Sequence, residues 1–594
     1  MILATMLFAA QAAVPPAPAL PMAAPLPPAL PWSGRSEGLI ARPDDPWITP
    51  AERARFEATP NLADSYAWLQ RLDAASDLVS IERIGTSPEG RPLIAVTARK
   101  GSAAKPVVLI QAGIHAGEID GKDAGMMLLR DIALRGKDGL LDDATFVFVP
   151  VFNVDGHERS SRWSRPNQRG PREQGWRTTA QNLNLNRDYL KADAPEMQAM
   201  IALIRRLDPA LYIDVHVTDG IDYQYDITYG FNGWGGEDAY SPAIARWMDG
   251  RLRPAFDRAL IRGGHIPGPL IFATDDRDPA VGLSAGPSSG RFSQGYGDLR
   301  HMPSILVENH SLKPYRQRVL GTYVLMEEAL RLVGAERSAV QRAVAEDRAA
   351  RPTEMSHGWQ AEEQPTTRRW RGVAWERYRS AASGRDEIRW LGQARDGEIA
   401  STGQRFAPAA PLPSAWWVPA TKPDLIAVLR LHGVEMTEAA GSTALDLDMV
   451  RLPLARLSQR ASEGRVPMNV GEGRHERRRV VMPPGSVRVP ADQPLGLVAA
   501  ALLEPDSRES LLAWGAFPEI LERTEYIEGY AIAPLADRML EADPALRAAF
   551  EERIAADPAF AADGDARLAW FYARTPYYDD RYLLYPVGRE TVER

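Results

Sequence analysis

Two histidines and a glutamate are the residues of this chain whose types and spacing best suit chemistry. His115 and Glu118 lie three residues apart, directly after the apolar run 106–114. His216 ends a second apolar run at 210–216. Two imidazoles and one carboxylate leave the fourth position of a tetrahedral zinc ion open to water. The pattern predicts a zinc site suited to hydrolysis, since a structural site has protein side chains in all four positions.

On its own, the spacing of His115 and Glu118 is weak evidence for a metal. A core histidine beside a solvated glutamate is the commoner arrangement. The positions of other polar residues favour the metal site, because His115, Asn153, His216 and Glu308 each lie at or near the end of an apolar, strand-like run. Ligands bind at the carboxyl edge of open α/β sheets, so we expect these side chains to converge there.

Strand-like and helix-like segments alternate from about residue 36 to residue 335. The expected strands are 106–114, 145–153, 210–216 and 304–308, and the expected helices are 122–134, 195–207, 241–260 and 316–333. Apolar strands that alternate with amphipathic helices predict an α/β fold, with a mostly parallel mixed sheet and helices on both faces.

A basic and amide-rich stretch follows the second expected strand. It contains Arg162, Arg165 and the run Asn182-Leu-Asn-Leu-Asn-Arg-Asp188. The planar guanidinium fork of arginine matches a carboxylate, so these groups suit the capture of an anionic substrate end. Most basic runs are solvated loops, and we therefore expect only one or two arginines between 162 and 177 to face the site.

Taken in order, these motifs resemble the signature of the M14 zinc carboxypeptidases, the carboxypeptidase A-like metallopeptidases. The matching motifs are His115-x-x-Glu118, Asn153-x-Asp-Gly156, Asn186-Arg187, His216, and Glu308 in Ile-Leu-Val-Glu-Asn. They cover roughly residues 60 to 335. The resemblance implies a carboxypeptidase-like fold for that part of the chain.

The resemblance also implies roles for individual residues. It implies one zinc ion per chain, held by His115, Glu118 and His216, with Glu308 as the general base for the reacting water. Asn186 and Arg187 are implied to bind the C-terminal carboxylate of a peptide substrate. An arginine that polarises the scissile carbonyl matches Arg165 best, with Arg162 as an alternative.

Three positions depart from the family pattern. The family's substrate-covering tyrosine has no clear counterpart, since Tyr296 lies several residues late. Gly117 stands where digestive members carry arginine, and Asn184 where many members place an aspartate behind the first zinc histidine. These departures bear on the preferred terminal residue more than on zinc hydrolysis. A wall from about 288 to 293, with Arg291 as its one charge, is expected to set that preference.

Composition excludes several classes of function. The chain has no cysteine, which excludes disulfides, thiolate metal sites and cysteine nucleophiles. Its net charge of −8, with both signs well mixed, does not predict a nucleic-acid partner. No stretch after the N-terminus has the ~18 uninterrupted apolar residues of a membrane span.

Three regions are expected along the chain. Residues 1–35 combine a signal-like segment, with an Ala10-Gln-Ala12 pattern that resembles a signal-peptidase site, and a linker rich in proline and alanine. This predicts export, to the periplasm or beyond. Residues 36–335 form the expected catalytic domain. Residues 336–594 form an accessory region, strand-rich to about 490 and helical after it, whose expected role is packing or substrate shaping.

Within the accessory region, short strand-like runs alternate with proline and glycine at 415–418, 425–431, 478–482 and 486–489. Helices are expected at 495–503, 511–521 and 545–555. The functional hypothesis for the whole chain is an exported zinc metallocarboxypeptidase that acts on peptides with a free C-terminal carboxylate. An amidase acting on cell-wall peptides and a non-catalytic protein that binds peptide ends are the alternatives.

Overall fold

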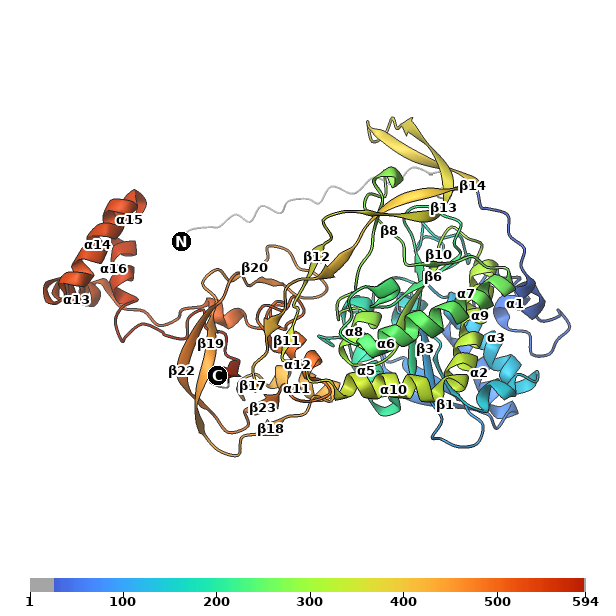
Figure 1. Ribbon diagram of the computed structural model, residues 1–594, viewed down its shortest axis with the longest axis horizontal. Coiled ribbons are helices and arrows are strands. Elements are labelled where there is room, and N and C mark those ends of the chain that lie inside the picture. The colour runs from blue at the N-terminus through green and yellow to red at the C-terminus, as the bar shows by residue number, and fades with distance from the viewer. Residues whose placement is uncertain (1–25, 592–594) are drawn as a thin grey trace, which may run out of the picture.

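A computed structural model of the protein describes residues 26–591. An α/β body and a strand-rich accessory region lie side by side, with a small group of helices at the far end of the accessory region (Figure 1). The predicted signal-like segment lies within residues 1–25, outside the described residues. Within the described part of the chain, no helix is long and apolar enough to cross a membrane.

An eight-stranded sheet in the order β1-β2-β4-β3-β5-β10-β6-β7 forms the centre of the α/β body. Its strands are β1 (Val79–Thr86), β2 (Pro92–Ala98), β3 (Val107–Ala112), β4 (Thr145–Val149), β5 (Leu211–Thr218), β6 (Ile227–Gly230), β7 (Pro267–Pro269) and β10 (Ser304–His310). The four adjacent strands β4, β3, β5 and β10 run parallel to one another. Antiparallel pairings flank them on both sides.

Helices cover both faces of this sheet. The longer ones are α2 (Leu62–Ala75), α3 (Asp120–Leu134), α5 (Pro195–Leu207), α7 (Arg253–Gly263) and α9 (Tyr315–Ala335). A Cβ at Gly121 of α3 would lie 3.0 Å from the Val215 side chain, so α3 lies close against that face of β5. Side chains alternate along a strand, so Tyr212 and Asp214 point to the opposite face. The predicted α/β fold, with a mainly parallel mixed sheet, is confirmed.

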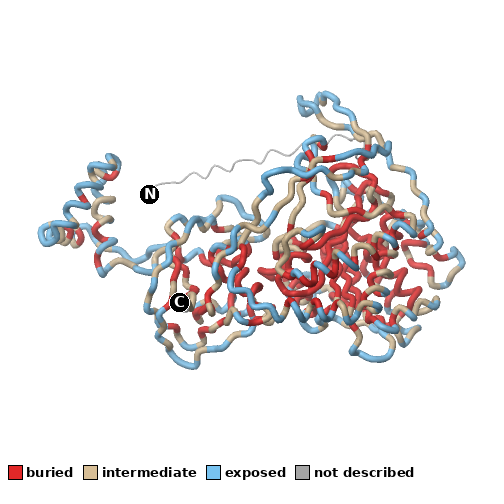
Figure 2. Tube along the Cα trace, viewed as in Figure 1, coloured by how far each residue is buried: buried red, intermediate tan, exposed pale blue. Residues whose placement is uncertain are grey.

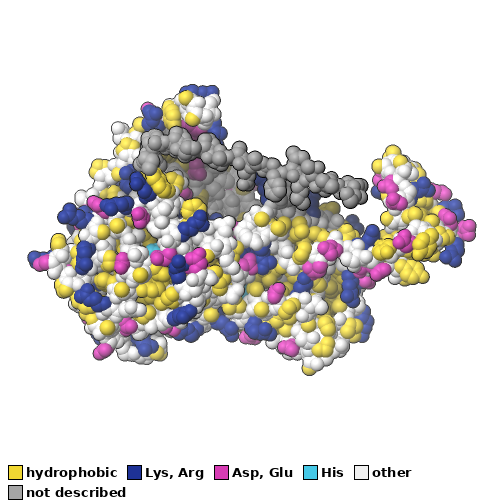
Figure 3. All heavy atoms as spheres, turned by 180° about the vertical axis from the view of Figure 1, so that it is seen from behind, with side chains coloured by type: hydrophobic (Ala, Val, Ile, Leu, Met, Phe, Trp, Pro, Cys, Tyr) yellow, Lys and Arg dark blue, Asp and Glu magenta, His cyan; other side chains and the backbone are white. Residues whose placement is uncertain are grey.

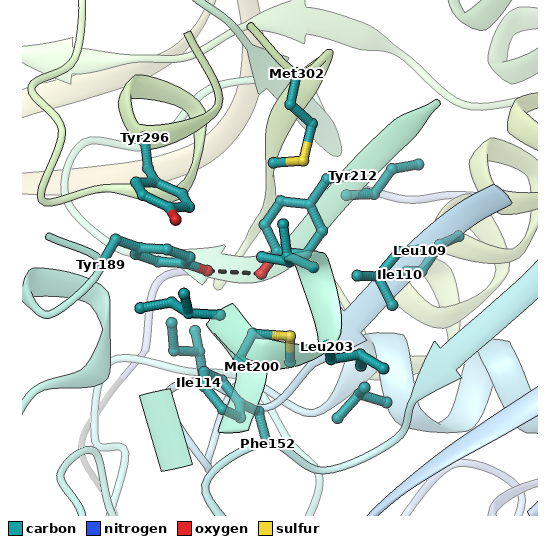
Figure 4. Close-up of a cluster of buried hydrophobic side chains, with 14 of the residues drawn as sticks. Leu109, Ile110, Ile114, Phe152, Tyr189, Met200, Leu203, Tyr212, Tyr296 and Met302 are labelled. Carbon is teal, nitrogen blue, oxygen red and sulfur yellow. Dashed lines mark hydrogen bonds between the residues drawn. The ribbon is translucent and has the colours of Figure 1, made fainter. Parts of the chain in front are cut away.

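A buried cluster lies on the face of the sheet opposite α3 (Figure 4). The hydroxyls of Tyr189 and Tyr212 are 2.8 Å apart, and Met200 and Leu203 of α5 lie close to them in the figure. Tyr189, Tyr212, Met200 and Leu203 are at most 2% exposed. Figure 2 shows that the interior of the α/β body is almost entirely buried. Strand β5, which carries the metal-ligand candidate His216 near its end, is therefore held by a well-packed core.

Shorter helices complete the α/β body: α1 (Pro50–Arg53), α4 (Val154–Glu158), α6 (Pro242–Trp247) and α8 (Ser293–Leu299). The expected helix 241–260 is present as α6 and α7, joined through the single π-helical turn Met248–Leu252. Helix α10 (Arg337–Ala349) then leads into the accessory region.

A long hairpin, β13 (Thr366–Arg379) and β14 (Asp386–Thr402), reaches back from the accessory region to the α/β body. Strand β14 pairs with β9 (Leu283–Ser284), which pairs with β8 (Phe272–Ala273), so the two regions share a four-stranded sheet. In Figure 1 the hairpin crosses above β6 and β10. The short pairs β11 (Glu354–Met355) with β16 (Ala410–Pro411) and β12 (Trp359–Ala361) with β15 (Gln404–Phe406) precede and follow it.

A six-stranded sheet in the order β18-β23-β17-β24-β19-β22 forms the centre of the accessory region. Its strands are β17 (Ala415–Val418), β18 (Thr437–Glu438), β19 (Thr443–Arg451), β22 (Arg474–Met482), β23 (Val487–Pro490) and β24 (Gly588–Glu590). Helix α12 (Gly496–Leu503) is fully buried beside them. The sheet thus takes a strand from near residue 590, and the expected division into a strand-rich and a helical part at about 490 does not separate its elements.

Two local expectations for the accessory region are wrong. Residues 425–431 belong to helix α11 (Pro423–His432), where Pro423 opens the helix and Gly433 ends it with a φ of +84°. Its buried residues Leu425, Ile426, Leu429 and His432 follow a helical period, which the almost continuous apolar run conceals. Residues 511–521 form turns and only a short 3-10 helix at Pro518–Leu521.

The last helices form a separate small group, α13 (Gly529–Ala542), α14 (Pro544–Ala556), α15 (Pro558–Ala562) and α16 (Gly564–Tyr572). Their apolar side chains pack into a cluster of their own, which includes Phe550, Phe560 and Phe571. Figure 1 shows this group projecting from the accessory region.

Candidate metal centre

His115, Glu118 and His216 converge at the carboxyl edge of the central strands. Nδ1 of His115 lies 3.0 Å from Oε1 of Glu118, and Nδ1 of His216 lies 3.1 Å from Oε2 of the same carboxylate. All three side chains are at most 3% exposed. Within the described residues, this is the one group of three or more His, Cys, Asp or Glu side chains that could hold a metal ion, with ligand atoms within 4.8 Å of one another.

The geometry of this cluster fits zinc. Ligand atoms about 2.1 Å from a tetrahedral zinc ion lie about 3.4 Å apart. The two nitrogen-to-oxygen separations of 3.0 and 3.1 Å are close to that value. Both histidines present the same ring nitrogen to Glu118, and imidazole with carboxylate is a ligand set that zinc accepts. The residues therefore suit a single divalent ion.

Each histidine contacts a second polar side chain through its other ring nitrogen. Nε2 of His115 lies 3.0 Å from Oδ1 of Asn184, and Nε2 of His216 lies 2.9 Å from Oδ2 of Asp214, although that ring nitrogen does not point directly at the oxygen. Such contacts fix the ring orientation of metal-binding histidines and raise their basicity. Asn184 lies behind the first histidine, as expected from the sequence.

Asp214 is part of a buried polar network that the sequence analysis missed. Its Oδ1 accepts a hydrogen bond from Nε2 of Gln111 at 2.8 Å, and Gln111 also donates to the hydroxyl of Tyr189 at 2.8 Å. Asp214 and Gln111 are fully buried. The Asp-x-His spacing on strand β5 was a signal for this contact, because residues two apart on a strand share a face.

The charges around His115, Glu118 and His216 favour a bound cation. Burial works against protonation of His216, but the carboxylates of Asp214, Glu118 and Glu308 outweigh it and raise the pKa of His216 to about 10. Burial lowers the pKa of His115 to about 4, so this ring is neutral at physiological pH and able to act as a ligand. Burial would raise the pKa of Glu118, yet its neighbours His115 and Arg165 hold it well below the usual range.

Glu308 lies directly beside the cluster, because β10 and β5 pair in parallel with Glu308 opposite His216. The residue is partly buried, and its Oε2 has no hydrogen-bond partner among the described residues. Burial, together with Glu118 and Asp214, raises the pKa of Glu308 to about 8, although His216 acts in the opposite direction. A carboxyl group whose pKa lies near the working pH, with one oxygen unpartnered among the described residues, is suited to exchange a proton with water.

Two arginines from the basic stretch face the cluster. Nη2 of Arg165 lies 2.9 Å from Oε1 of Glu118, and Nη1 of Arg177 lies 3.4 Å from the same oxygen. Arg162 is exposed and lies over the ring of Trp163 at 4.6 Å. Of the two arginines considered for the scissile carbonyl, the structure thus brings Arg165 to the site and not Arg162. Arg177 was included in the stretch but not singled out.

Asn186 and Arg187 follow Asn184 on a short 3-10 turn, Leu185–Arg187. Oδ1 of Asn186 is buried without a hydrogen-bond partner among the described residues. Nη1 of Arg187 donates to the backbone oxygen of Asn186 at 2.6 Å, and its guanidinium lies 4.4 Å from the centre of the Phe292 ring. Because Asn184 contacts His115, this turn is held next to the metal cluster.

Two of the sequence motifs have structural roles. Asn153 caps helix α4 by accepting a hydrogen bond from the Gly156 backbone at 2.9 Å, and its amide donates to the backbone oxygen of Arg177 at 3.2 Å. Gly117 lies where a Cβ would be 2.6 Å from Cγ of Arg165 and 2.7 Å from the backbone oxygen of Gly175. A larger residue at 117 would therefore displace the arginine that contacts Glu118.

The tyrosine near the motifs does not cover the site. Tyr296 is fully buried, its hydroxyl lies 2.9 Å from Nδ1 of His432, and its ring lies beside Tyr189 in the core (Figure 4). His310 is also a core residue, since Nε2 contacts Asp222 at 2.9 Å and the ring stacks on Tyr223 at 4.0 Å.

Comparisons with known proteins agree with this site. Residues 65–242 match the zinc carboxypeptidase family, Peptidase_M14. Carboxypeptidase B of Astacus astacus is 32% identical over 94 residues, which are 15% of this chain and 31% of that protein. Carboxypeptidase A6 of Homo sapiens is 31% identical over 144 residues, which are 23% of this chain and 32% of that protein. The chain thus spans about a third of the length of these relatives.

Solved structures of carboxypeptidases are similar at lower identity. A metallo-carboxypeptidase from Burkholderia cenocepacia aligns with a TM-score of 0.35 and 18% identity over 46% of this chain and 69% of that chain. Carboxypeptidase A from Helicoverpa armigera aligns with a TM-score of 0.34 and 19% identity over 49% and 75%. Residues 65–242, which include His115, Glu118 and His216, are thus similar to the M14 family of zinc carboxypeptidases.

Proposed function

We propose that this protein is a zinc metallocarboxypeptidase that hydrolyses the C-terminal bond of peptides with a free carboxylate. The observation that carries the proposal is the placement of His115 Nδ1 and His216 Nδ1 against the two oxygens of Glu118, at 3.0 and 3.1 Å. His115, Glu118 and His216 would hold one zinc ion per chain. Bound zinc would supply Lewis acidity, which lowers the pKa of a water towards ~7 and polarises a carbonyl.

Glu308 is proposed as the general base. Its free Oε2 and raised pKa suit it to take a proton from the attacking water and to hold that proton for the leaving amine. Its place opposite His216 in the sheet keeps it at the site without a contact that would occupy that oxygen.

Asn186, Arg187 and Arg165 are proposed to bind the substrate. Arg187 donates a hydrogen bond to the Asn186 backbone, and its guanidinium fork is suited to a terminal carboxylate. Arg165, at 2.9 Å from Glu118, is placed to donate to the oxygen of the scissile carbonyl as negative charge develops there. We further propose export, from the signal-like segment, and the three-part division of the chain at about residues 35 and 335.

Metal analysis and a peptide panel test the proposal. The purified protein should contain one zinc per chain and cleave peptides with free C-termini, but not the same peptides amidated at that end. Glu308→Gln should lower kcat by about 10²- to 10⁴-fold while zinc content is unchanged. Asp219→Asn, at an exposed acid three residues past His216, is the matched control and should keep full activity.

Other outcomes identify the alternatives. Cleavage of cell-wall peptides alone would support an amidase. Bound zinc with no turnover on any substrate would support a protein that binds peptide ends. Equal cleavage of free and amidated peptides would contradict the carboxypeptidase proposal.

A further inference from the structure

A hairpin from the accessory region reaches the proposed substrate site. Strands β20 (Arg456–Leu457) and β21 (Met468–Asn469) pair at its base, and Ser462 pairs with Arg465 at its tip. We call residues 456–469 the tip hairpin. Its tip lies against the segment 183–193, which also carries Asn184, Asn186 and Arg187.

Two contacts fix the tip in place. The guanidinium of Arg465 binds both carboxylate oxygens of Asp193, at 2.8 and 2.5 Å. Gly464 lies so close to the α/β body that a Cβ there would be 2.3 Å from Cδ2 of Leu183. A bidentate ion pair is among the stronger polar contacts, and Asp193 is itself held by Lys191 at 3.0 Å. The position of the tip is therefore specified by charge and by shape.

The turn at the tip places a glutamate in an unfavourable backbone conformation. Glu463 has a φ of +51° and Gly464 a φ of +80°, and Ser462 and Arg465 exchange backbone hydrogen bonds of 2.8 and 3.1 Å. Positive φ at both central residues of a two-residue hairpin turn is typical of Asn-Gly or Asp-Gly. Glutamate in this conformation is strained, and such strain persists at functional sites.

The Glu463 side chain faces the arginine proposed to bind the substrate carboxylate. Oε1 of Glu463 lies 3.9 Å from Nε of Arg187, and the two side chains are 27% and 26% exposed. This contact is an ion pair too long for a hydrogen bond, so the Glu463 carboxylate remains available to another cation. A terminal residue whose carboxylate binds Arg187 would lie close to Glu463.

The charge of Arg291 is already neutralised by an ion pair with Glu509. Arg291, expected from the sequence to mark the wall of the specificity pocket, contacts Glu509 through Nε at 3.0 and 3.2 Å and through Nη2 at 2.9 Å. Its guanidinium also lies 4.8 Å from the Trp514 ring. Arg291 is thus bound to the accessory region, and its charge is compensated before any substrate arrives.

We propose that Glu463 is a specificity-determining residue, which makes the accessory region part of the substrate site and favours C-terminal residues with cationic side chains over acidic ones. The inference depends on the proposed function, because it takes Arg187 as the partner of the terminal carboxylate. Arg187 would be occupied by that carboxylate, Arg291 is paired with Glu509, and Arg177 lies 3.4 Å from Glu118, so among these described charges Glu463 is left to act on the terminal side chain.

The expected size of the effect follows from charge separation. Two unit charges about 6 Å apart in a partly solvated site change binding by about tenfold. Glu463 attracts a C-terminal lysine and repels a C-terminal glutamate. Removal of its charge should therefore lower the ratio of kcat/KM for the lysine peptide to kcat/KM for the glutamate peptide by about 10- to 100-fold. All three peptides carry the terminal carboxylate that Glu463 also repels, so that repulsion cancels from the lysine-to-glutamate ratio, and the leucine peptide should show it alone.

The test compares kcat/KM for peptides that differ only in a terminal lysine, leucine or glutamate. Glu463→Asn removes the charge and suits the positive φ, so this variant should be at least as stable as the natural protein. It should lose the preference for lysine over glutamate, mainly through KM, while kcat for the leucine peptide stays the same. Arg465→Ala, which releases the tip, should narrow the preference in the same way. Glu472→Gln, at an exposed acid of the same region, is the control and should change nothing.

A binding measurement separates this inference from the proposed function. Calorimetry with N-acetyl-lysine and N-acetyl-glutamate on the zinc-loaded protein needs no turnover. If no peptide is cleaved, the proposed function fails, while tighter N-acetyl-lysine binding that Glu463→Asn abolishes would still support the role of Glu463. An unchanged lysine-to-glutamate ratio in Glu463→Asn, or equal binding of both ligands by the natural protein, would overturn it.

Discussion

Asp214→Asn is the substitution that tests the metal centre most directly. Asp214 is fully buried, and its Oδ2 lies 2.9 Å from Nε2 of His216. Asparagine keeps the size of the side chain and can still accept the hydrogen bond from Gln111, so the change removes little except the charge. The substitution therefore isolates the electrostatic support that Asp214 gives to the proposed zinc ligand.

The magnitude can be bounded from this geometry. Two opposite charges 4 Å apart interact by ~4 kcal/mol at the effective dielectric of a protein interior. The asparagine dipole retains part of that interaction, and contacts behind metal ligands typically change metal affinity by 10- to 100-fold. We expect zinc affinity to fall within that range, which is ~1.4 to 2.8 kcal/mol.

Competition with a fluorescent chelator measures the affinity. The exposed Asp219→Asn variant is the control, and its zinc affinity should match that of the natural protein. In the zinc-free protein, the pKa of His216, raised to about 10 by Asp214, Glu118 and Glu308 against the effect of burial, should fall clearly in the variant when it is followed by NMR. A folded Asp214→Asn protein that binds zinc within twofold of the natural protein would refute the reasoning.

Three further predictions concern the same domain. Chelation of zinc should lower the melting temperature by several degrees, since a ligand at 1,000 times its Kd stabilises a fold by ~4 kcal/mol; an unchanged melting curve would argue against the site. Gly117→Ala should destabilise the protein by ~1 to 3 kcal/mol in denaturant titrations, because the new Cβ would lie 2.6 Å from Cγ of Arg165. Gly139→Ala is the control and should destabilise the protein less, because its Cβ would lie 3.8 Å from Oδ2 of Asp142. Glu196 is fully buried with both oxygens unpartnered among the described residues, and burial, with Asp155 and Asp188, raises its pKa to about 7. Between pH 4.5 and 7, Glu196 therefore stays protonated in the folded state but loses its proton in the unfolded state, where its pKa is about 4.5. Because the unfolded state binds fewer protons, the protein becomes less stable as pH rises through this interval. Relative to the natural protein, Glu196→Gln should gain up to ~3 kcal/mol in free energy of unfolding between pH 4.5 and 7. A stability difference between the two proteins that does not vary with pH would contradict the raised pKa of Glu196.

The α/β body could be predicted because the apolar pattern within each segment and the alternation of strands and helices along the chain indicate the same fold. The expected helix 195–207 is α5, and the expected strand 304–308 lies within β10. In the accessory region the signals conflict. The run 425–431 is apolar at almost every position, so neither a period of two nor one of 3.6 stands out, and only Pro423 and Gly433 mark the helix. The hairpin β13–β14 has exposed, charged strands, which hides its strand character from an apolar pattern.

In the candidate site, too, some residues could be predicted from the sequence and others could not. The cluster of His115, Glu118 and His216 could be predicted, because each residue lies near or just after the carboxyl end of a buried strand and such ends meet at one edge. Arg177 and Glu463 could not be assigned from sequence. Arg177 lies in a basic loop whose local pattern fits solvent equally well, and Glu463 is 276 residues beyond Arg187 in a region without a recognisable motif. Long-range contacts of this kind depend on how two regions dock, which periodicity does not encode.

The place of β24 in the accessory sheet has a consequence for biosynthesis. Strand β24 lies between β17 and β19, with Gly588–Glu590 paired to residues 415–417 on one side and Asp448 paired to Arg589 on the other. A growing polypeptide cannot join these two strands until residue 590 has left the ribosome. Until then β17 and β19 present unpaired edges, which are prone to aggregation. Nascent chains halted before that point should need chaperone protection that the finished protein no longer requires.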